Sequence, residues 1–171
     1  MGIKLAKALG NKVVAISTSN KKEALAKSKG ADAFVVSKDP ESIKKHAMNC
    51  DIILDTVSAP HDVNLYWPLL NKKGVFVCIG GNTNPQTISL VPFMYFRQSL
   101  TGSIIGGIRE TQEVVDLCHK HNIYPDCEVI EADKIDWAWD QLTGPTGNAD
   151  GIRYVIDIKK SLENKNFIPK E

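Results

Sequence analysis

The sequence of 171 residues lacks several features that would each point to a particular class of protein. Its 4 cysteines, Cys50, Cys78, Cys118 and Cys127, form no Cys-x-x-Cys pair, so the spacing typical of a structural zinc site is missing. Neither sign of charge dominates. The 21 basic and 20 acidic residues leave a net charge of +1, which does not favour nucleic acid or an anionic lipid surface as a partner.

Long apolar runs are also missing. No stretch approaches the roughly 20 apolar residues of a membrane span, and the residues after Met1 have the pattern of an amphipathic helix rather than of a signal peptide. We therefore expect a protein of the cytoplasm or of another reducing compartment. What is present is ordinary: 43% hydrophobic and 24% charged residues suit one globular domain with an appended piece.

Short apolar runs alternate with helical segments as far as Ile79. Strands are predicted over 13–16, 33–36, 51–55 and 74–79. Helices are predicted over 2–10, over 21–28, after Asp39 as N-cap with Pro40 in the first turn, and less regularly over about 60–71. Strands that alternate with helices at this spacing indicate a parallel sheet covered on both faces, the doubly wound or Rossmann-like α/β fold.

Beyond Gly81 the pattern is more varied. It predicts a short helix from Pro92, a strand over 99–105, an amphipathic helix over 110–119, a strand over 128–130, a helix capped by Asp133 and ending at Leu142, a loop over 144–151 and a strand over 152–158. The residues after Ile158 are polar, and we expect them to fray.

The turn after the first predicted strand is the most informative candidate site, because a doubly wound sheet binds ligands at the carboxyl ends of its strands. It contains Ser17, Thr18, Ser19 and Lys22, and no Asp or Glu that would bind the ribose 2′-hydroxyl of NAD. Small hydroxyl residues and the two lysines Lys21 and Lys22 are what a 2′-phosphate needs, so the turn favours NADP. A plain Ser/Thr turn before a capped helix explains the same residues equally well.

Two other strand ends carry candidate cofactor residues. Thr56 and Val57 follow the third strand, where they would face the cofactor ribose or pyrophosphate. Gly80 and Gly81 follow the fourth, where backbone without a Cβ can approach a flat ligand. A simple turn is the alternative in both places, and for the glycines alone it is the favoured one. His61 could approach this loop, although we favour no site role for it.

Taken together and in order, these residues resemble the cinnamyl-alcohol-dehydrogenase-like branch of the zinc-type medium-chain dehydrogenases/reductases. The similarity extends over nearly the whole chain and rests on an ordered series rather than on a single motif. It is carried by Met1 to Lys7, Ser17 to Ser19 with Lys22, Lys29 to Asp32, Asp55 to Val57, Leu100 to Gly106 with Glu110 and Thr111, and Arg153 to Asp157.

The resemblance implies further site residues and a domain division. Gly2 would be the third glycine of the phosphate loop. The candidate cofactor residues also come to include Ser103, Ile104 and Ile105 near the nicotinamide, and Arg153 in the closing strand. It implies a partial Rossmann domain over 1–125, a C-terminal remnant of the catalytic domain over 126–158, a polar tail over 159–171, and a homodimer through the 99–106 strand.

Members of that family are longer than this chain. They carry a catalytic domain with Cys, His and Glu ligands of a catalytic zinc, and the first strand and first two glycines of their phosphate loop have no counterpart here. We therefore assign no catalytic or metal-binding residue. The sheet is expected to lack its first strand, so we expect the isolated chain to bind NADP weakly or not at all.

Three functions remain open. The chain is a fragment of an NADPH-dependent zinc alcohol dehydrogenase that reduces aldehydes by hydride transfer, but is inactive alone. Alternatively, it is a non-catalytic dehydrogenase-like subunit of a larger assembly. A third interpretation assigns it to the zinc-free, quinone-reductase-like branch. The Ser17 turn and the 101–106 run favour the zinc branch.

Overall fold

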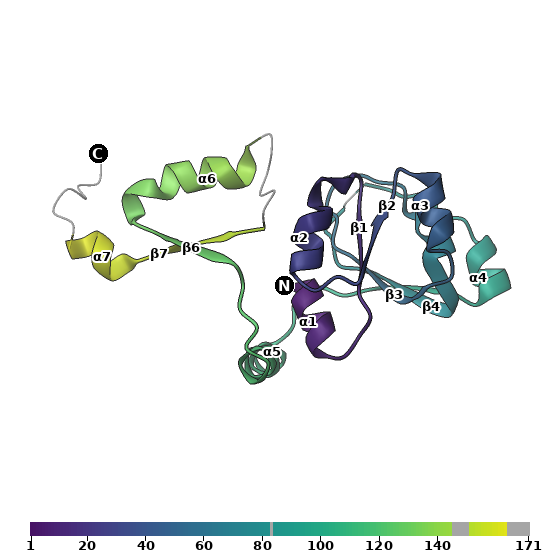
Figure 1. The fold of residues 1–171 in the computed structure, drawn as a ribbon, viewed down its shortest axis with the longest axis horizontal. Helices are drawn as coiled ribbons and strands as arrows, with labels where there is room; N and C mark the ends of the chain where they lie inside the picture. The colour runs from purple at the N-terminus through teal and green to yellow at the C-terminus, as the bar shows by residue number, and fades with distance from the viewer. Residues whose placement is uncertain (83, 145–150, 164–171) are drawn as a thin grey trace. The chain divides into compact units, whose positions relative to one another are not determined.

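The computed structural model describes residues 1–82, 84–144 and 151–163 (Figure 1). The chain divides into two compact units. One comprises Gly2–His121, and the other comprises Asn122–Glu171 together with Met1. Among the described residues, no helix is both long and apolar enough to cross a membrane.

The larger unit, Gly2–His121, contains two parallel sheets. One pairs β1 (Val14–Ser17) with β2 (Ala33–Val36), and the other has the order β3 (Cys50–Asp55), β4 (Leu70–Cys78), β5 (Ser99–Gly102). Within the described part of this unit, no strand pairs with β1 or β3 on the remaining edge. A doubly wound sheet runs third, second, first, fourth, fifth, sixth. The observed pairs fit that order when β1 to β5 are its second to sixth strands, and no described strand lies in the place of the first. The predicted Rossmann-like α/β fold is confirmed.

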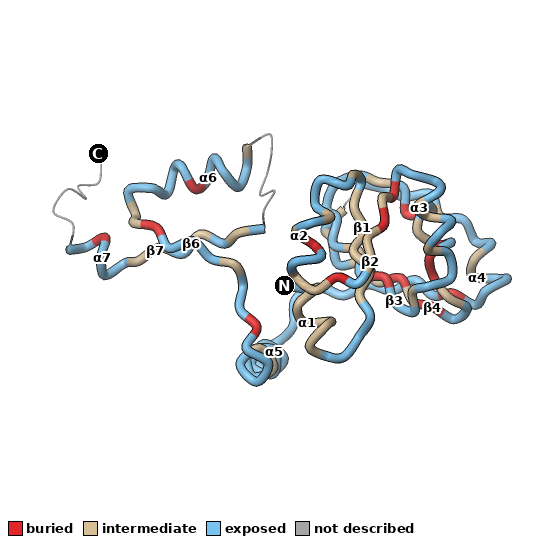
Figure 2. Tube along the Cα trace, in the orientation of Figure 1, coloured by how far each residue is buried: buried red, intermediate tan, exposed pale blue. Residues whose placement is uncertain are grey.

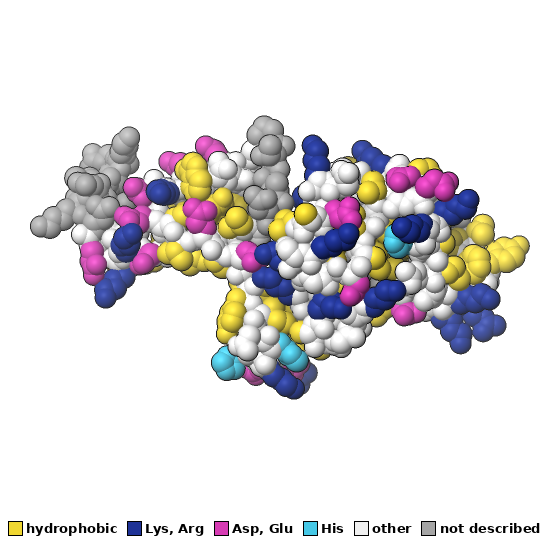
Figure 3. All heavy atoms as spheres, viewed as in Figure 1, with side chains coloured by type: hydrophobic (Ala, Val, Ile, Leu, Met, Phe, Trp, Pro, Cys, Tyr) yellow, Lys and Arg dark blue, Asp and Glu magenta, His cyan; other side chains and the backbone are white. Residues whose placement is uncertain are grey.

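Helices separate these strands much as predicted. They are α1 (Gly2–Ala8), the 3-10 turn η1 (Asn20–Lys22) leading into α2 (Glu23–Ser28), α3 (Pro40–Lys45), α4 (Val91–Phe96) and α5 (Ile108–Lys120). The predicted N-cap of α3 is confirmed, because the Asp39 carboxylate accepts the Glu41 N–H at 3.1 Å. On the face drawn in Figure 3, basic and acidic side chains are interspersed over this unit rather than gathered by sign.

The predicted helix over 60–71 is wrong. Two short 3-10 turns, η2 (Val63–Leu65) and η3 (Trp67–Leu69), stand there, and β4 already begins at Leu70. Pro68 lacks the N–H that a continuing helix needs, and Leu70 pairs instead with Cys50 of β3. The predicted strand over 99–105 is too long, because β5 ends at Gly102 and leaves Ile104 and Ile105 87% and 89% exposed.

The core of this unit lies between β2, the β3–β4 pair and the 3-10 turns (Figure 2). Trp67 lies at its centre: its ring is 5.1 Å from that of Phe76 and 5.0 Å, edge-on, from that of Phe93. The buried members are Val35, Ile53, Val63, Trp67, Leu69, Leu70 and Phe76. This core supports the carboxyl ends of β3 and β4, where candidate site residues follow.

The smaller unit pairs β6 (Cys127–Ile130) with β7 (Arg153–Ile156) in parallel and adds η4 (Ala132–Lys134), α6 (Ile135–Thr143) and α7 (Ile158–Glu163). Asp133 lies inside η4 and does not cap α6, whose N-cap is Lys134. Most of the predicted loop over 144–151 lies outside the described residues.

Two predictions at the end of this unit are wrong. The strand over 152–158 is shorter than predicted, because β7 ends at Ile156, and the residues expected to fray begin with α7. That helix is held by Asp157, whose carboxylate accepts the Lys160 N–H at 2.9 Å, and by buried Ser161, whose hydroxyl accepts the Ala132 N–H at 2.8 Å. The remainder of the predicted tail, 164–171, lies outside the described residues.

Candidate cofactor-binding site

The turn after β1 is open. Ser17 is the last residue of β1, and its carbonyl accepts a hydrogen bond of 2.8 Å from the N–H of Ser37, which follows β2. Ser19 stands in extended backbone before η1, and its hydroxyl makes no capping hydrogen bond. Thr18 and Lys22 are exposed. The turn therefore presents hydroxyl groups and an ammonium group that are available to an anionic ligand.

The ends of β3 and β4 are joined through Asp55. Its carbonyl accepts the Ile79 N–H at 2.8 Å and the Gly80 N–H at 2.9 Å. A Cβ at Gly80 would overlap the Val57 carbonyl, whereas a Cβ at Gly81 would meet nothing within 4 Å. A glycine is thus required at position 80 because the Val57 backbone lies against it, whereas the space beside Gly81 is open.

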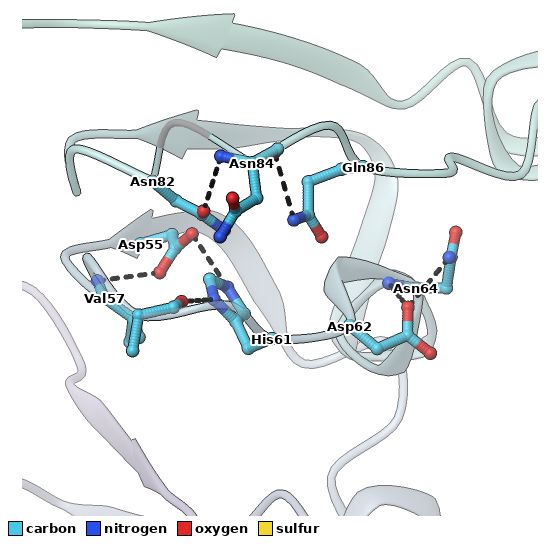
Figure 4. A network of polar contacts seen from close by, with 9 residues as sticks. Asp55, Val57, His61, Asp62, Asn64, Asn82, Asn84 and Gln86 are labelled. Carbon is cyan, nitrogen blue, oxygen red and sulfur yellow. Dashed lines mark hydrogen bonds and ion pairs between the residues drawn. The ribbon is translucent and has the colours of Figure 1, made fainter.

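The loop from Asp55 to His61 is closed by side-chain hydrogen bonds (Figure 4). The Asp55 carboxylate accepts the Val57 N–H at 3.0 Å through Oδ1, an Asx turn, and contacts His61 Nε2 at 3.1 Å through Oδ2. The other ring nitrogen, Nδ1, lies 2.9 Å from the Ala59 carbonyl oxygen. The side chains of Asp55 and His61 are only 10% and 14% exposed, so this pair is shielded from water.

The predicted site residues fall into three groups. Val57 and Gly80 meet at the strand ends, with Thr56 and Gly81 adjacent. Ser103 joins the end of β4 because its N–H donates to the Cys78 carbonyl at 3.0 Å. Ser17, Thr18, Ser19 and Lys22 form the separate turn after β1. The others stand apart: Gly2 begins α1, Ile104 and Ile105 follow β5, and Arg153 belongs to the other unit.

Sequence reasoning did not assign His61 to this site. The spacing of His61 from Asp55 does not by itself predict a contact, because the contact depends on the loop turning back on itself. Asp32 belongs to the series of residues that carries the resemblance, but the sequence predicts no contact for it. In the structure its carboxylate accepts the Val13 N–H at 2.7 Å and binds Lys7 Nζ of α1 at 2.9 Å, which attaches α1 to the start of the first sheet.

Among the residues that the structure describes, no group of three or more His, Cys, Asp or Glu side chains is placed to hold a metal ion. The two deeper thiols are not activated: burial raises the pKa of Cys50 and of Cys78, and the nearby charges of Asp51 and Asp55, respectively, add to the shift.

Comparison with known proteins connects this arrangement to one family. Residues 1–120 match the family model described as zinc-binding dehydrogenase. Cinnamyl alcohol dehydrogenase 8 of Arabidopsis thaliana is 44% identical over 165 residues, which are 95% of this chain and 45% of that protein. 8-hydroxygeraniol dehydrogenase of Catharanthus roseus is 40% identical over 167 residues, 96% of this chain and 45% of that protein.

Solved structures give the same result. A cinnamyl alcohol dehydrogenase from Sorghum bicolor superposes with a TM-score of 0.82 at 33% identity, covering 94% of this chain and 45% of that one. The enzyme of the same name from Helicobacter pylori, complexed with NADP(H), gives 0.76 at 34% identity with the same coverage. These matches confirm the predicted resemblance, and the chain spans about 45% of the length of these relatives.

Proposed function

Because the chain belongs to the zinc-binding dehydrogenase family, we propose that it is the cofactor-binding part of an NADPH-dependent alcohol dehydrogenase or aldehyde reductase. The observation that carries this proposal is the open turn after β1, with its free hydroxyl groups, an exposed lysine and no acid at the strand end. A similar structure from Helicobacter pylori was solved with NADP(H), which supports the choice of cofactor.

In this proposal the turn binds the 2′-phosphate. The hydroxyl groups of Ser17, Thr18 and Ser19 donate hydrogen bonds to the phosphate oxygens, and Lys22 contributes a positive charge. An Asp or Glu at the same place would repel the phosphate, so the turn discriminates NADPH from NADH by charge as well as by hydrogen bonding.

The remaining contacts follow the strand ends toward the nicotinamide. Thr56, Val57 and Gly81 lie where β3 and β4 end together, and the open space beside Gly81 admits a flat group. Ser103, Ile104 and Ile105 follow β5 at the same edge. On resemblance alone, Gly2 and Arg153 are added to this set as cofactor contacts.

In this proposal the chain binds the cofactor, and the zinc ligands belong to the catalytic domain that the family resemblance implies. The cofactor supplies the hydride that reduces an aldehyde or, in reverse, accepts it from a primary alcohol. The described residues offer no ligand set for the zinc expected of the family, so they hold and orient the cofactor and take no part in polarising a carbonyl. The chain alone should therefore give no turnover.

Equilibrium binding of NADPH and NADH tests the proposal. We expect the wild-type chain to bind NADPH more tightly than NADH. Lys22→Glu should weaken NADPH by tenfold or more, about 1.4 kcal/mol, and remove the preference. Lys72→Glu, an exposed change in β4 outside the candidate site, serves as the matched control and should leave both affinities unchanged. Equal or tighter binding of NADH by the wild type would overturn the NADP assignment.

A turnover assay tests the division of labour. Purified chain with NADPH and a panel of aromatic and aliphatic aldehydes should show no cofactor oxidation above the protein-free rate, with or without added zinc. Zinc-dependent consumption of NADPH by this chain would contradict the proposal.

The edge of β5 is the proposed dimer surface. Within the described residues β5 pairs only with β4, and the adjacent Ile104 and Ile105 are almost fully exposed. Pairing of this edge with a second copy would cover both features. Light scattering should then detect a dimer that Ile104→Glu dissociates, while a wild-type monomer would exclude it.

A further inference from the structure

Both ring nitrogens of His61 face hydrogen-bond acceptors. Nε2 lies 3.1 Å from Oδ2 of Asp55, and Nδ1 lies 2.9 Å from the carbonyl oxygen of Ala59. Neither partner offers a proton: a carbonyl oxygen and an ionised carboxylate only accept. A neutral imidazole has one N–H and one lone pair, so it can satisfy only one of these two contacts.

An imidazolium satisfies both contacts. With a proton on each nitrogen, it donates to Ala59 and, with charge assistance, to Asp55. The 14% exposure of the His61 side chain leaves little room for water to replace either bond. His46 provides the contrast within the same chain: its Nδ1 lies 2.9 Å from the Ser42 carbonyl oxygen, a single contact that a neutral ring can make.

The His61 ring lies beside one acidic and one aromatic side chain. Asp55 reaches it from the end of β3, and the Tyr66 ring, which follows η2, lies 6.0 Å from its own. The carboxylate of Asp62, the next residue, is directed instead at Asn64, whose N–H it accepts at 2.9 Å. From β4, Cys78 is paired with Asp55 and responds to the charge of that carboxylate. Among the described residues, the one ion pair of the His61 ring is therefore with the Asp55 carboxylate.

We infer that His61 is an imidazolium clamp. By donating to Asp55 and Ala59 at once it closes the 55–61 loop, and it thereby positions Thr56 and the Val57 peptide group beside Gly80. His61 is a positioning residue, since its own nitrogens are directed at the loop and not at a ligand (Figure 4). Its consequence for cofactor affinity rests on the proposed function, whereas its protonation and the closure of the loop do not.

The ring nitrogens can be observed directly. Long-range ¹H–¹⁵N correlation spectra of the 171-residue chain near neutral pH should show both His61 nitrogens in the protonated range, with assignment by loss of the signals in His61→Gln. A ring with one bare nitrogen would overturn the inference, whatever the cofactor does.

Amide hydrogen exchange tests the positioning. The Val57 N–H, bound to Asp55 in the closed loop, should exchange at least tenfold faster in His61→Gln, while His46→Gln leaves it unchanged. Unchanged chemical shifts in α2 and β2 would establish that His61→Gln is folded. Asp55→Asn, which removes the other half of the pair, should accelerate the same amide. Wild-type exchange at Val57 in both variants would overturn the inference.

NADPH affinity then separates this inference from the proposed function. We expect His61→Gln to weaken NADPH severalfold and His46→Gln to have no effect. If the wild-type chain binds NADH as tightly as NADPH, the cofactor proposal fails while the ring and amide signals still decide the role of His61. If NADPH binds and His61→Gln leaves its affinity intact, the positioning role is wrong.

Discussion

The turn after β1 and the loop after β3 occupy equivalent places, each at the carboxyl end of a parallel strand, yet their polar groups are arranged in opposite ways. In the 55–61 loop, the Asp55 and His61 side chains bond to the loop itself. In the 17–22 turn, within the described structure, no side-chain hydrogen bond is recorded for Ser17, Thr18, Ser19 or Lys22. The closed 55–61 loop therefore holds its backbone in one conformation, whereas the open 17–22 turn keeps hydrogen-bond donors for a ligand.

The largest effect is expected where the core supports the closed loop. Phe76→Ala removes a fully buried ring of β4 that packs on Trp67, and should cost about 3–5 kcal/mol of unfolding free energy. Tyr95→Ala, a change at a 76% exposed ring on α4, is the matched control and should cost little. Chemical denaturation measures both. A loss below about 1 kcal/mol for Phe76→Ala would contradict the packing described.

The contact between the two strand ends comes next. Gly80→Ala should destabilise the chain by about 1–3 kcal/mol, because its Cβ overlaps Val57 backbone that cannot move without breaking the closed loop. Gly81→Ala, one residue later with open space around it, should change stability by less than about 0.5 kcal/mol. Equal effects of the two substitutions on the denaturation midpoint would show that the loop is not closed as described.

Acid should weaken the contact of the Asp32 carboxylate with Lys7, which attaches α1 to the first sheet. The pKa of Asp32 is lowered from its ordinary value, first by the Val13 N–H and then by Lys7. A carboxyl group with a lowered folded-state pKa stabilises the fold above its unfolded value, near 3.8, and that contribution is lost as the pH falls through the folded pKa. The thermal midpoint of the wild type should therefore fall more steeply than that of Asp32→Asn below about pH 4. Parallel curves would contradict the assignment.

The smallest effect concerns thiol reactivity. Burial raises the pKa of Cys50 and Cys78, while Cys127 is exposed, so iodoacetamide near pH 8 should label Cys127 first. Cys78 adjoins the closed loop, and its labelling should accelerate in His61→Gln if that loop opens. Mass spectrometry of timed digests gives the order, and early labelling of Cys78 in the wild type would indicate a loop that is already open.

Local patterns predicted much of the fold. The pair Asp39 and Pro40 marks a helix start within three residues. The apolar runs at 33–36 and 51–55 are strands, as predicted, although Ile52 and Leu54 of the second run are 62% and 56% exposed. Pro68 was the missed local signal, since it prevents a regular helix where one was predicted. The strand end at Gly102 depends on how far β4 extends beside it, which the run of Ser99 to Ile105 does not reveal.

The site was less predictable because its residues acquire their roles through contacts across the loop. Thr56, Val57 and Gly80 could be chosen by their place after strands, but the same rule gives no reason to choose His61. Its two hydrogen bonds depend on a return of the chain over six residues that no local pattern encodes. Conversely, the turn at Ser17 was recognisable because its chemistry is local: three hydroxyl groups and two lysines lie within six residues.

Selection of a 2′-phosphate by the open turn after β1 can be measured by titrating the ¹⁵N-labelled chain with adenosine 2′,5′-bisphosphate. The bisphosphate should shift the amide signals of Ser17, Thr18, Ser19 and Lys22 in a saturable way, and 5′-AMP at the same concentrations should not. Equal shifts with both nucleotides, or shifts confined to residues elsewhere, would show that this turn does not select a 2′-phosphate.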